Sequence, residues 1–403
     1  MRAIYLCGPT VYDKAHIGNI RPILSFDIFL RAHRLLGNDF MFIHNITDID
    51  DKIIEKAQQE SVSPQAIGEK YTKHYLKLLT LFNIKLPPSS LLPKVTDHIE
   101  VIIDFIKQLV AKKFAYVKND NVWFDVTKAH NYGDVSHQKL SALHYEHNLD
   151  KNHPADFALW KKVPIGWSFD SPWGKGRPGW HTECATFVNQ ITGGKQLFIH
   201  GGGIDLIFPH HENENAQYEV LNKRAITERW VHIGHLSVNK QKMSKSLGNM
   251  IDGQDFINTY GADTLRMMFL MTSPFSPLEI NDSLIANAQI LTLKFKKVFL
   301  QSQLHDGHQT DKKVIINIAS KISQWQFGSA LKDVLHQVKS FHQSFKNGAL
   351  IINIMTLLGF GFTSLIVSQE EKDMYLKWHQ LRAQKQFVQA DALRKILQNK
   401  ELI

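Results

Sequence analysis

The sequence predicts an α/β protein built on a doubly wound parallel sheet. Short apolar runs at residues 3–7 and 40–43 have the length of buried strands, and a helix-like stretch at 20–36 lies between them. Further strand-like runs occupy 196–200 and 231–235. Strands that alternate with helices along the chain are typical of a parallel sheet with helices on its faces.

Two other regions differ from this pattern. Residues 116–178 are rich in Tyr, Trp, Asp, Gly and Pro, which predicts an inserted subdomain. From residue 291 onward, sixteen lysines and arginines stand against eight aspartates and glutamates, and this excess makes up nearly all of the net charge of +9. Apolar residues recur there at helical spacing, at Ile315, Ile318, Ile322, Trp325, Leu331, Val334, Leu335 and Val338. We interpret this region as a basic helical bundle that suits a polyanion, with an ordinary solvated surface as the alternative.

Composition excludes several classes of protein. The 403 residues predict two to four domains, and 43% hydrophobic with 21% charged residues excludes disorder as the main state. Two cysteines are too few for a disulfide scaffold, and this low number indicates a reducing cytoplasm. The first residues do not have the pattern of a signal peptide. Residues 347–369 carry no charge, but glycines 359 and 361 divide them, so we expect two buried helix pieces and no membrane contact. A monomer is the simplest expectation.

A histidine and a carboxylate stand four residues apart in a candidate metal site. If residues 209–215 open a helix, His210 and Glu214 share a face and can bind one ion. Because the cysteines have no disulfide partner elsewhere, Cys7 and Cys184 are the candidates for the remaining ligands of a zinc ion. Cys7 ends the first strand-like run, and strand ends converge in a parallel sheet. Buried cysteines and a polar helix start also occur without a metal, and the spacing alone leaves this open.

Two further motifs suit phosphate. His16 and Asn19 stand where a helix is expected to follow the first strand, and helix N-termini attract phosphate. Lys242 and Lys245 stand in a Ser/Gly-rich segment more than two hundred residues later and can form a cationic clamp. Either motif alone is common by chance, whereas their order and separation are more specific. The run of three glycines at 201–203 matches an oxyanion-hole signature, but the chain has no G-x-S-x-G, so these glycines are expected to let the backbone approach a ligand.

Taken in order, these segments resemble the cysteinyl-tRNA synthetases, a family of the class I aminoacyl-tRNA synthetases. The resemblance rests on residues 6–13, 16–19, 45–52, 156–161, 171–174, 177–181, 200–203, 208–214 and 242–246. The tail from about 290 resembles the family only loosely. The implied fold is a Rossmann-like class I catalytic domain with an inserted subdomain and a C-terminal helical bundle.

The resemblance implies a zinc ion held by Cys7, Cys184, His210 and Glu214, with the thiolate of substrate cysteine binding that zinc. A hydroxyl is a poor substitute for a thiolate at a sulfur-rich zinc site, which would reject serine without editing. The other members of the implied amino-acid pocket are Gly8, Thr47 and Trp180, and a core aromatic residue is the alternative interpretation of Trp180.

The implied reaction has two steps: cysteine and ATP with Mg²⁺ give cysteinyl-adenylate, which then esterifies the 3′ end of tRNA(Cys). His16, Asn19, Lys242 and Lys245 would hold and neutralise the ATP phosphates. Asp205 would help to place the nucleotide or the amino group. Asn19 replaces the second histidine of the family's first signature motif, so it can donate a hydrogen bond but carries no charge.

The resemblance also assigns segments to the chain: 1–115 and 179–238 as the two halves of the catalytic domain, 116–178 as the inserted connective subdomain, 239–290 as the KMSKS loop and stem-contact region, and 291–403 as the helical tRNA- and anticodon-binding bundle. Two alternatives stay open at this point. One is a paralogous ligase that joins cysteine to an amino sugar, and the other is a non-catalytic nucleic-acid-binding module.

Overall fold

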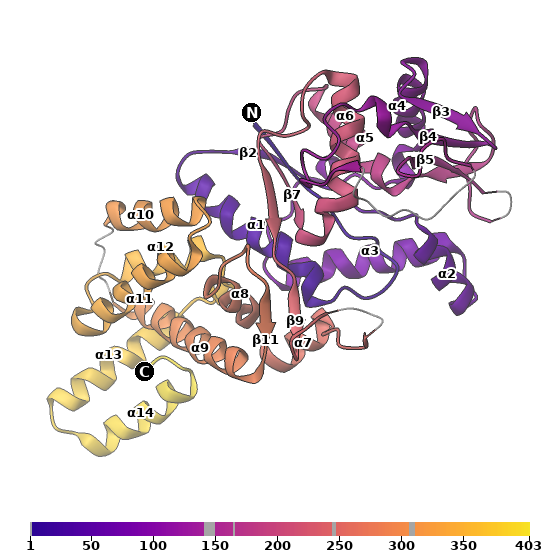
Figure 1. The fold of residues 1–403 in the computed structure, drawn as a ribbon. Coiled ribbons are helices and arrows are strands. Elements are labelled where there is room, and N and C mark those ends of the chain that lie inside the picture. The colour runs from indigo at the N-terminus through magenta and orange to yellow at the C-terminus, as the bar shows by residue number, and fades with distance from the viewer. Residues whose placement is uncertain (1, 141–149, 164–165, 244–246, 306–310) are drawn as a thin grey trace. The chain divides into compact units, whose positions relative to one another are not determined.

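A computed structural model describes residues 2–140, 150–163, 166–243, 247–305 and 311–403 (Figure 1). The chain divides into two compact units, each of which is described by itself. Unit 1 comprises Met1–Pro22, Phe40–Leu78 and Leu86–His235, and unit 2 comprises Ile23–Asp39, Leu79–Lys85 and Leu236–Ile403. The five segments predicted from the sequence differ from these units, and their boundaries stay predictions.

The strands of the described residues are β1 (Arg2–Leu6), β2 (Phe40–His44), β3 (Ala115–Lys118), β4 (Asn121–Phe124), β5 (Phe157–Lys162), β6 (Gly176–Pro178), β7 (Ile199–Gly203), β8 (Trp230–Ile233), β9 (Leu236–Val238), β10 (Gln241–Lys242) and β11 (Leu278–Ile280). The α-helices are α1 (Ile17–Leu35), α2 (Asp51–Glu60), α3 (Pro64–Leu81), α4 (Ile99–Ala111), α5 (Trp180–Thr192), α6 (Glu212–Asn222), α7 (Gly253–Tyr260), α8 (Ala262–Leu270), α9 (Asp282–Leu304), α10 (Lys312–Ser323), α11 (Phe327–Ser344), α12 (Gly348–Leu358), α13 (Gln369–Ala383) and α14 (Phe387–Asn399).

The core of unit 1 is a four-stranded sheet in the order β2-β1-β7-β8, and all of its pairings are parallel. This confirms the predicted parallel sheet. Residues 3–6 of β1 are buried because the strand is central and is covered on both faces, as apolar strands of parallel sheets are. Helices α4, α5 and α6 pack on one another in this unit (Figure 1).

Two of the predicted strands lie at shifted positions. The strand predicted at 196–200 is β7 at Ile199–Gly203, and the strand predicted at 231–235 is β8 at Trp230–Ile233. Glycines weaken an isolated strand, so the sequence pattern indicated that the strand ends before them. In the sheet, backbone pairing with β1 on one side and β8 on the other holds Gly201 in β7.

The predicted insertion forms a second, antiparallel sheet in the order β3-β4-β5-β6. Trp160 of β5 is fully buried and Phe124 of β4 stacks on Phe157 at 4.9 Å between ring centroids. The aromatic composition of residues 116–178 thus supplies the packing of this sheet.

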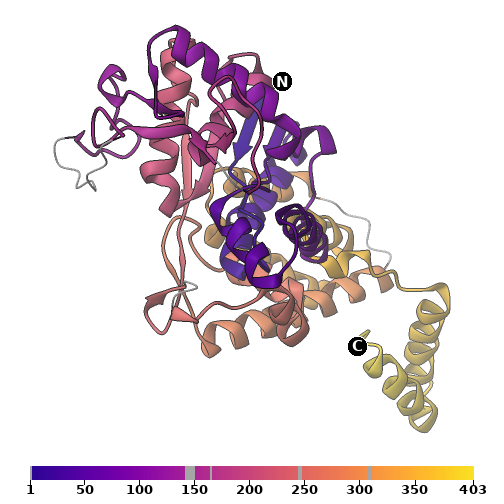
Figure 2. The same ribbon diagram turned by 90° about the vertical axis from the view of Figure 1, so that its right-hand side faces the viewer.

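Unit 2 is mainly helical, with the small sheet β10-β9-β11. Apolar spacing in the sequence predicted α10 and α11, and the residues Ile315, Ile318 and Ile322 are buried on one face of α10. In Figure 2, α13 and α14 lie side by side as an antiparallel pair at the C-terminal end of the chain.

The uncharged stretch 347–369 begins with α12, which ends at Gly359 in a left-handed conformation with φ of 78°. The next element is a single 3₁₀ turn, Gly361–Ser364, where the prediction was a second helix piece. The carboxylate of Asp263 explains the turn because it accepts the N–H groups of Gly361 and Phe362 at 2.6 and 3.1 Å. Among the described residues, no helix has the length and apolar character needed to cross a membrane.

Candidate metal centre and active site

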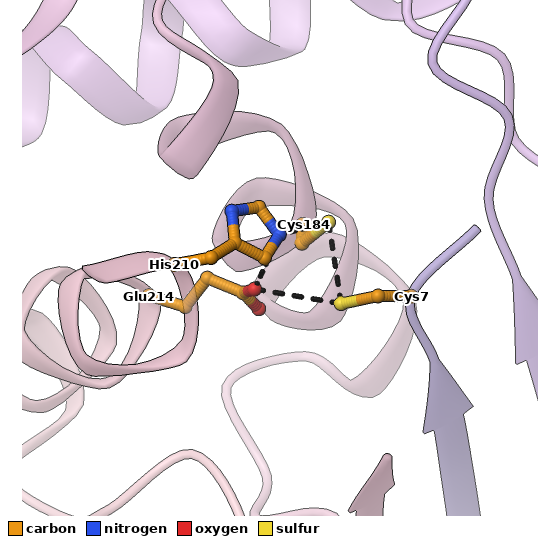
Figure 3. A group of neighbouring side chains, drawn as sticks. All are labelled: Cys7, Cys184, His210 and Glu214. Carbon is orange, nitrogen blue, oxygen red and sulfur yellow. Dashed lines mark hydrogen bonds and ion pairs between the residues drawn. The ribbon is translucent and has the colours of Figure 1, made fainter. Parts of the chain in front are cut away.

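Four buried side chains from four segments of unit 1 converge at the carboxyl end of β1 (Figure 3). Cys7 directly follows β1, Cys184 lies in α5, His210 lies in the helical turn Ile207–His211, and Glu214 lies in α6. Their ligand atoms all lie within 4.8 Å of one another. The structure therefore brings together the four residues that the sequence predicted as metal ligands.

The distances within this cluster are those between ligands of one small ion. The sulfurs of Cys7 and Cys184 are 3.9 Å apart, and Cys184 Sγ is 3.7 Å from His210 Nε2. Glu214 Oε1 lies 3.5 Å from Cys7 Sγ and 2.9 Å from His210 Nε2. Tetrahedral zinc with bonds of about 2.3 Å to sulfur and about 2.0 Å to nitrogen separates two sulfurs by about 3.8 Å and sulfur from nitrogen by about 3.5 Å. The donor set and its spacing fit zinc.

Without a metal, Cys184 and Glu214 carry negative charge and His210 carries positive charge. Burial alone would raise the pKa of the Cys184 thiol, but hydrogen bonds with Cys7 and His210 bring it down to about 6. Burial would likewise lower the pKa of His210, whereas the carboxylate of Glu214 raises it to about 10. The pKa of Glu214 falls well below its usual range because His200 and His210 outweigh the cost of burial. A thiolate and a carboxylate thus face an imidazolium proton that a metal cation can displace.

A second layer of histidines surrounds the cluster, and the sequence analysis did not identify it. His200 Nε2 lies 2.7 Å from Glu214 Oε2, the oxygen that faces away from His210. His211 Nε2 lies 3.4 Å from Cys7 Sγ, and His211 Nδ1 lies 2.8 Å from His232 Nε2. Cys7, His200 and His211 form a second possible three-ligand group, which has one sulfur where the first has two. The position of His200 and His232 on neighbouring parallel strands was the signal available in the sequence.

The same histidines explain one of the glycines at 201–203. A Cβ at Gly202 would lie 2.8 Å from Cε1 of His211, so this glycine makes room for the imidazole ring. The sequence predicted that these glycines admit a ligand, and at Gly202 the close neighbour is instead a side chain of the protein.

The α6 segment fixes other neighbours as well. The buried carboxylate of Glu212 accepts N–H groups from Gly133, Val135 and Ser136 at 2.8 to 3.1 Å. Tyr132 donates its hydroxyl to the Asn213 side chain at 2.6 Å. Two residues that lie between the candidate ligands His210 and Glu214 therefore attach the loop at 132–136 to the start of α6.

Gly8 and Thr47, both predicted pocket residues, lie in one chain of hydrogen bonds that begins at the half-buried Gly8 and ends at the buried Glu183. The N–H of Gly8 donates to the Asn45 side chain at 2.8 Å, and the Asn45 amide donates to Thr47 Oγ1 at 3.4 Å. Thr47 donates in turn to Glu183 Oε2 at 2.8 Å. No side chain fits at Gly8, because a Cβ there would lie 1.7 Å from the Asn45 carbonyl oxygen. The sequence analysis missed Asn45 and Glu183.

Trp180 begins α5 and lies against the cluster. Its ring stacks on His210 with centroids 4.1 Å apart and an interplanar angle of 22°. The residue is 36% exposed, which is more than a core aromatic residue leaves open. Trp180 is therefore not a core aromatic residue, and its place in the amino-acid pocket stays a prediction.

His16 and Asn19 form the start of α1. His16 Nδ1 accepts the N–H of Gly18 at 3.1 Å, and Asn19 Oδ1 accepts the N–H of His16 at 3.1 Å. Because its oxygen accepts this hydrogen bond, Asn19 can donate to a phosphate only through its amide NH₂. The contact of His16 with a phosphate stays a prediction.

Of the three remaining predicted residues, Asp205 and Lys242 are at the surface. Asp205 is exposed in the 3₁₀ turn Ile204–Leu206 that directly follows β7. Lys242 is exposed in β10 of unit 2, and its carbonyl accepts a hydrogen bond from the Asn249 side chain at 3.4 Å. Lys245 lies outside the described residues.

The parallel sheet, the helix-start motif at its first strand and the ligand cluster at its carboxyl edge define a class of protein, the class I tRNA synthetases. A family model described as "tRNA synthetases class I (C) catalytic domain" matches residues 2–290. The solved structure of methionyl-tRNA synthetase from Mycobacterium tuberculosis in complex with methionyl-adenylate has the same fold. It matches with a TM-score of 0.67 at 13% identity and covers 89% of this chain and 90% of that one.

Curated relatives match over nearly the whole chain. A protein named cysteine--tRNA ligase from Mesomycoplasma hyopneumoniae (strain 232) is 40% identical over 397 residues, which cover 98% of this chain and 96% of that protein. A cysteine--tRNA ligase from Malacoplasma penetrans (strain HF-2) is 38% identical over 420 residues, covering 99% of this chain and 95% of that protein. The chain belongs to the cysteine--tRNA ligase family.

Proposed function

We propose that the protein activates cysteine with ATP to cysteinyl-adenylate and transfers the cysteinyl group to the 3′ end of tRNA(Cys). The observation that carries this proposal is the buried cluster of two thiols, an imidazole and a carboxylate at the carboxyl edge of the parallel sheet. In open α/β sheets this edge is where ligands bind. The match of relatives named cysteine--tRNA ligase along the whole chain supports it.

The first step requires in-line placement of the cysteine carboxylate against the α-phosphate of ATP and neutralisation of the charge that develops there. His16 and Asn19 donate hydrogen bonds to the phosphates from the start of α1. Lys242 and Lys245 add positive charge, and Mg²⁺ accompanies the ATP. Asp205, next to the end of β7, helps to place the nucleotide.

Cys7, Cys184, His210 and Glu214 are the residues that hold one zinc ion. When bound, the zinc supplies a Lewis acid for which a thiolate is a much better ligand than a hydroxyl. The protein's own contribution is to bury the ligands, to orient Glu214 through His200, and to close the pocket with Gly8, Thr47 and Trp180. Both cysteines of the chain are free and buried, which suits a reducing cytoplasm.

Aminoacylation assays test this function directly. We expect cysteine-dependent exchange between ATP and pyrophosphate, and transfer of labelled cysteine to tRNA(Cys), with serine giving neither signal. An amino sugar offered in place of tRNA tests the paralogous ligase. Exchange without tRNA charging but with an amino-sugar product would replace the proposed acceptor, and a chain without any exchange would be a binding module.

We also propose that residues 291–403 contact tRNA, because this region carries most of the excess positive charge. Three exposed lysines on α13, on α14 and in the turn between them allow a test away from the buried core, and the variant carries Lys377→Gln, Lys385→Gln and Lys395→Gln. Each lost phosphate contact should reduce the slope of log affinity against log salt by about 0.7–0.9 in filter binding.

The matched control carries Lys107→Gln, Lys113→Gln and Lys139→Gln, which remove three exposed lysines of unit 1. Equal tRNA affinity and an equal salt slope for the two triple variants and the unchanged chain would exclude this role for the region.

The monomeric state stays a prediction. Light scattering at several protein concentrations measures the molecular mass and so tests it.

A further inference from the structure

Unit 2 contains a cavity at the carboxyl ends of two parallel strands. β9 and β11 pair in parallel, with Val238 opposite Ile280, and the cavity lies where both strands end. Helix α7 and the start of α9 form its walls (Figure 1). Its volume of about 420 Å³ lies within the range of small-molecule sites. The carboxyl ends of parallel strands are also where ligands bind in open α/β sheets.

The inner surface of the cavity is apolar. Phe256 of α7, Ile280 of β11 and Ile285 of α9 line it and are only 1 to 5% exposed. Val238 and Ile251 complete this apolar floor. None of the lining residues belongs to the metal cluster or to the residues predicted to bind cysteine or ATP. The cavity therefore shares no residue with the candidate site of unit 1.

The outer part of the cavity is polar and carries negative charge. The lining includes no lysine, arginine or histidine, and its polar members are Asn239, Asp255, Thr259, Tyr260, Asn281 and Asp282. Asp255 and Asp282 are exposed, and neither carboxylate has a hydrogen-bond or ion-pair partner among the residues that the structure describes. The carboxylate of Glu279 in β11 differs, because it accepts from the Ser237 hydroxyl and the Lys240 N–H. The cavity thus has two negative charges that no protein group neutralises.

This lining predicts the class of ligand. Two carboxylates without a counter-charge attract positive charge and repel phosphate, which disfavours ATP and the tRNA backbone as occupants. The apolar floor favours methylene groups beside that charge, because a hydrated metal ion gains nothing from burial against isoleucine and phenylalanine. The half-buried ring of Tyr260 adds an aromatic face for an ammonium group. An aliphatic chain with an ammonium group at each end meets these conditions.

We propose that this cavity binds an aliphatic diamine or polyamine, with ammonium groups at Asp255 and Asp282 and methylene groups on the apolar floor. Asn239 and Ile251, which also line the cavity, lie on either side of Lys242 in the sequence. A bound amine therefore contacts both ends of the segment that carries the predicted cationic clamp. The inference does not rest on the proposed function, because the binding needs neither cysteine nor ATP nor tRNA.

Equilibrium dialysis of the full chain against labelled putrescine tests the proposal. ATP and tRNA are left out because they bind amines themselves. The chain has a net charge of +9, so a general electrostatic attraction does not account for binding of a dication. Saturable binding of one putrescine per chain is the expected result.

Two competitors separate the parts of this recognition. Butylamine has the same four carbons as putrescine but only one ammonium group, and Mg²⁺ has the same charge but no carbon chain. Butylamine should bind roughly fivefold more weakly than putrescine, the upper end of the value of one exposed ion pair. Mg²⁺ at the concentration of putrescine should displace none of it.

Asp255→Asn and Asp282→Asn test the two carboxylates separately. Each change keeps the size of a side chain at an exposed position, and putrescine should bind roughly fivefold more weakly to either variant. The control combines Glu370→Gln and Asp391→Asn, which remove two exposed carboxylates of α13 and α14 that do not line the cavity. The control changes the net charge by twice as much as either variant, yet it should bind putrescine as the unchanged chain does.

Three results would overturn the proposal. The first is an absence of saturable binding at millimolar putrescine. The second is an equal loss of affinity in the control, which would show that the binding depends on overall charge and not on the cavity. The third is displacement by Mg²⁺ or butylamine as effective as that by unlabelled putrescine, which would show that the carbon chain or the second ammonium group contributes nothing. The competition experiments use the unchanged chain, so their result holds even if a variant does not fold.

Discussion

Two buried polar clusters, one in each unit, hold their charges in different ways. In unit 2, the Asp27 carboxylate accepts from Arg31 at 2.9 Å, from Arg266 at 2.7 Å and from the Lys85 N–H at 3.0 Å. Arg266 also donates to the carbonyls of Phe82, Asn83 and Leu358. In unit 1, the partners of Glu214 are the imidazoles of His200 and His210 and the thiol of Cys7, which can all lose or exchange a proton.

This difference separates a structural cluster from one that can receive a ligand. The guanidinium groups around Asp27 are permanently charged, and they bind backbone carbonyls of several segments, so the cluster is complete without any further group. The proton on His210 and the charges of Glu214 and Cys184 can instead be exchanged for a metal cation. Four variants or conditions test this contrast, from the largest expected effect to the smallest.

Asp27→Ala should have the largest effect, and the effect should be on stability. The change leaves Arg266 buried without a carboxylate, which typically costs about 3–5 kcal/mol. Urea unfolding followed by circular dichroism measures the loss, and the zinc content should be unchanged. Asp391→Asn is the control: it breaks an exposed ion pair with Arg394, so the unfolding midpoint should not move. An equally stable Asp27→Ala variant would show that the cluster is not structural.

Cys184→Ser should lower the affinity for the metal and for the substrate cysteine. Replacing a residue that merely orients a ligand typically costs 10- to 100-fold in metal affinity, so the loss of a ligand should cost at least about 100-fold. The apparent KM for cysteine should rise strongly as well. Metal analysis and pyrophosphate exchange measure the two effects, with Thr186→Ala on the same helix as the control. Full zinc content together with an unchanged KM would contradict the assignment of Cys184.

His200→Phe should weaken metal binding less than Cys184→Ser does. The variant keeps an aromatic ring beside Trp230 but removes the hydrogen bond to Glu214 Oε2, for which we expect a loss of roughly 10- to 100-fold in zinc affinity. His200→Gln, which can donate to Glu214, should recover part of it. The reverse order, with His200→Phe worse than Cys184→Ser, would place the metal at Cys7, His200 and His211 instead.

Acid should weaken the structural cluster in a defined range. Burial alone would raise the pKa of Asp27, but Arg266 and Arg31 hold it below its usual value. A carboxylate whose folded pKa is lowered contributes stability above its unfolded pKa of about 3.9, and this contribution is lost as pH falls through the folded value. The difference in unfolding free energy between the unchanged chain and Asp27→Asn should therefore shrink below about pH 4. A difference that stays constant down to about pH 2 would show that Asp27 gains nothing from its arginines.

Much of the fold is encoded in local sequence patterns. The apolar runs at β1 and β2 and the helical spacing of α10 and α11 indicate their structure directly, because side-chain periodicity reflects which face is buried. The glycines of β7 were harder to interpret. A strand containing them depends on pairing with two neighbours that are remote in sequence.

The candidate site also has some features that the sequence predicts and others that only the tertiary structure shows. The sequence by itself determined the chemistry: two cysteines without a disulfide, a histidine and a glutamate four residues apart, and the motifs that resemble a synthetase. Only the tertiary structure decided that His200 orients Glu214 and that Glu183 is buried beside Thr47 with one donor among the described residues. Burial and hydrogen-bond partners are properties of segments far apart in the chain. No local pattern records them until the sheet has brought the strand ends together.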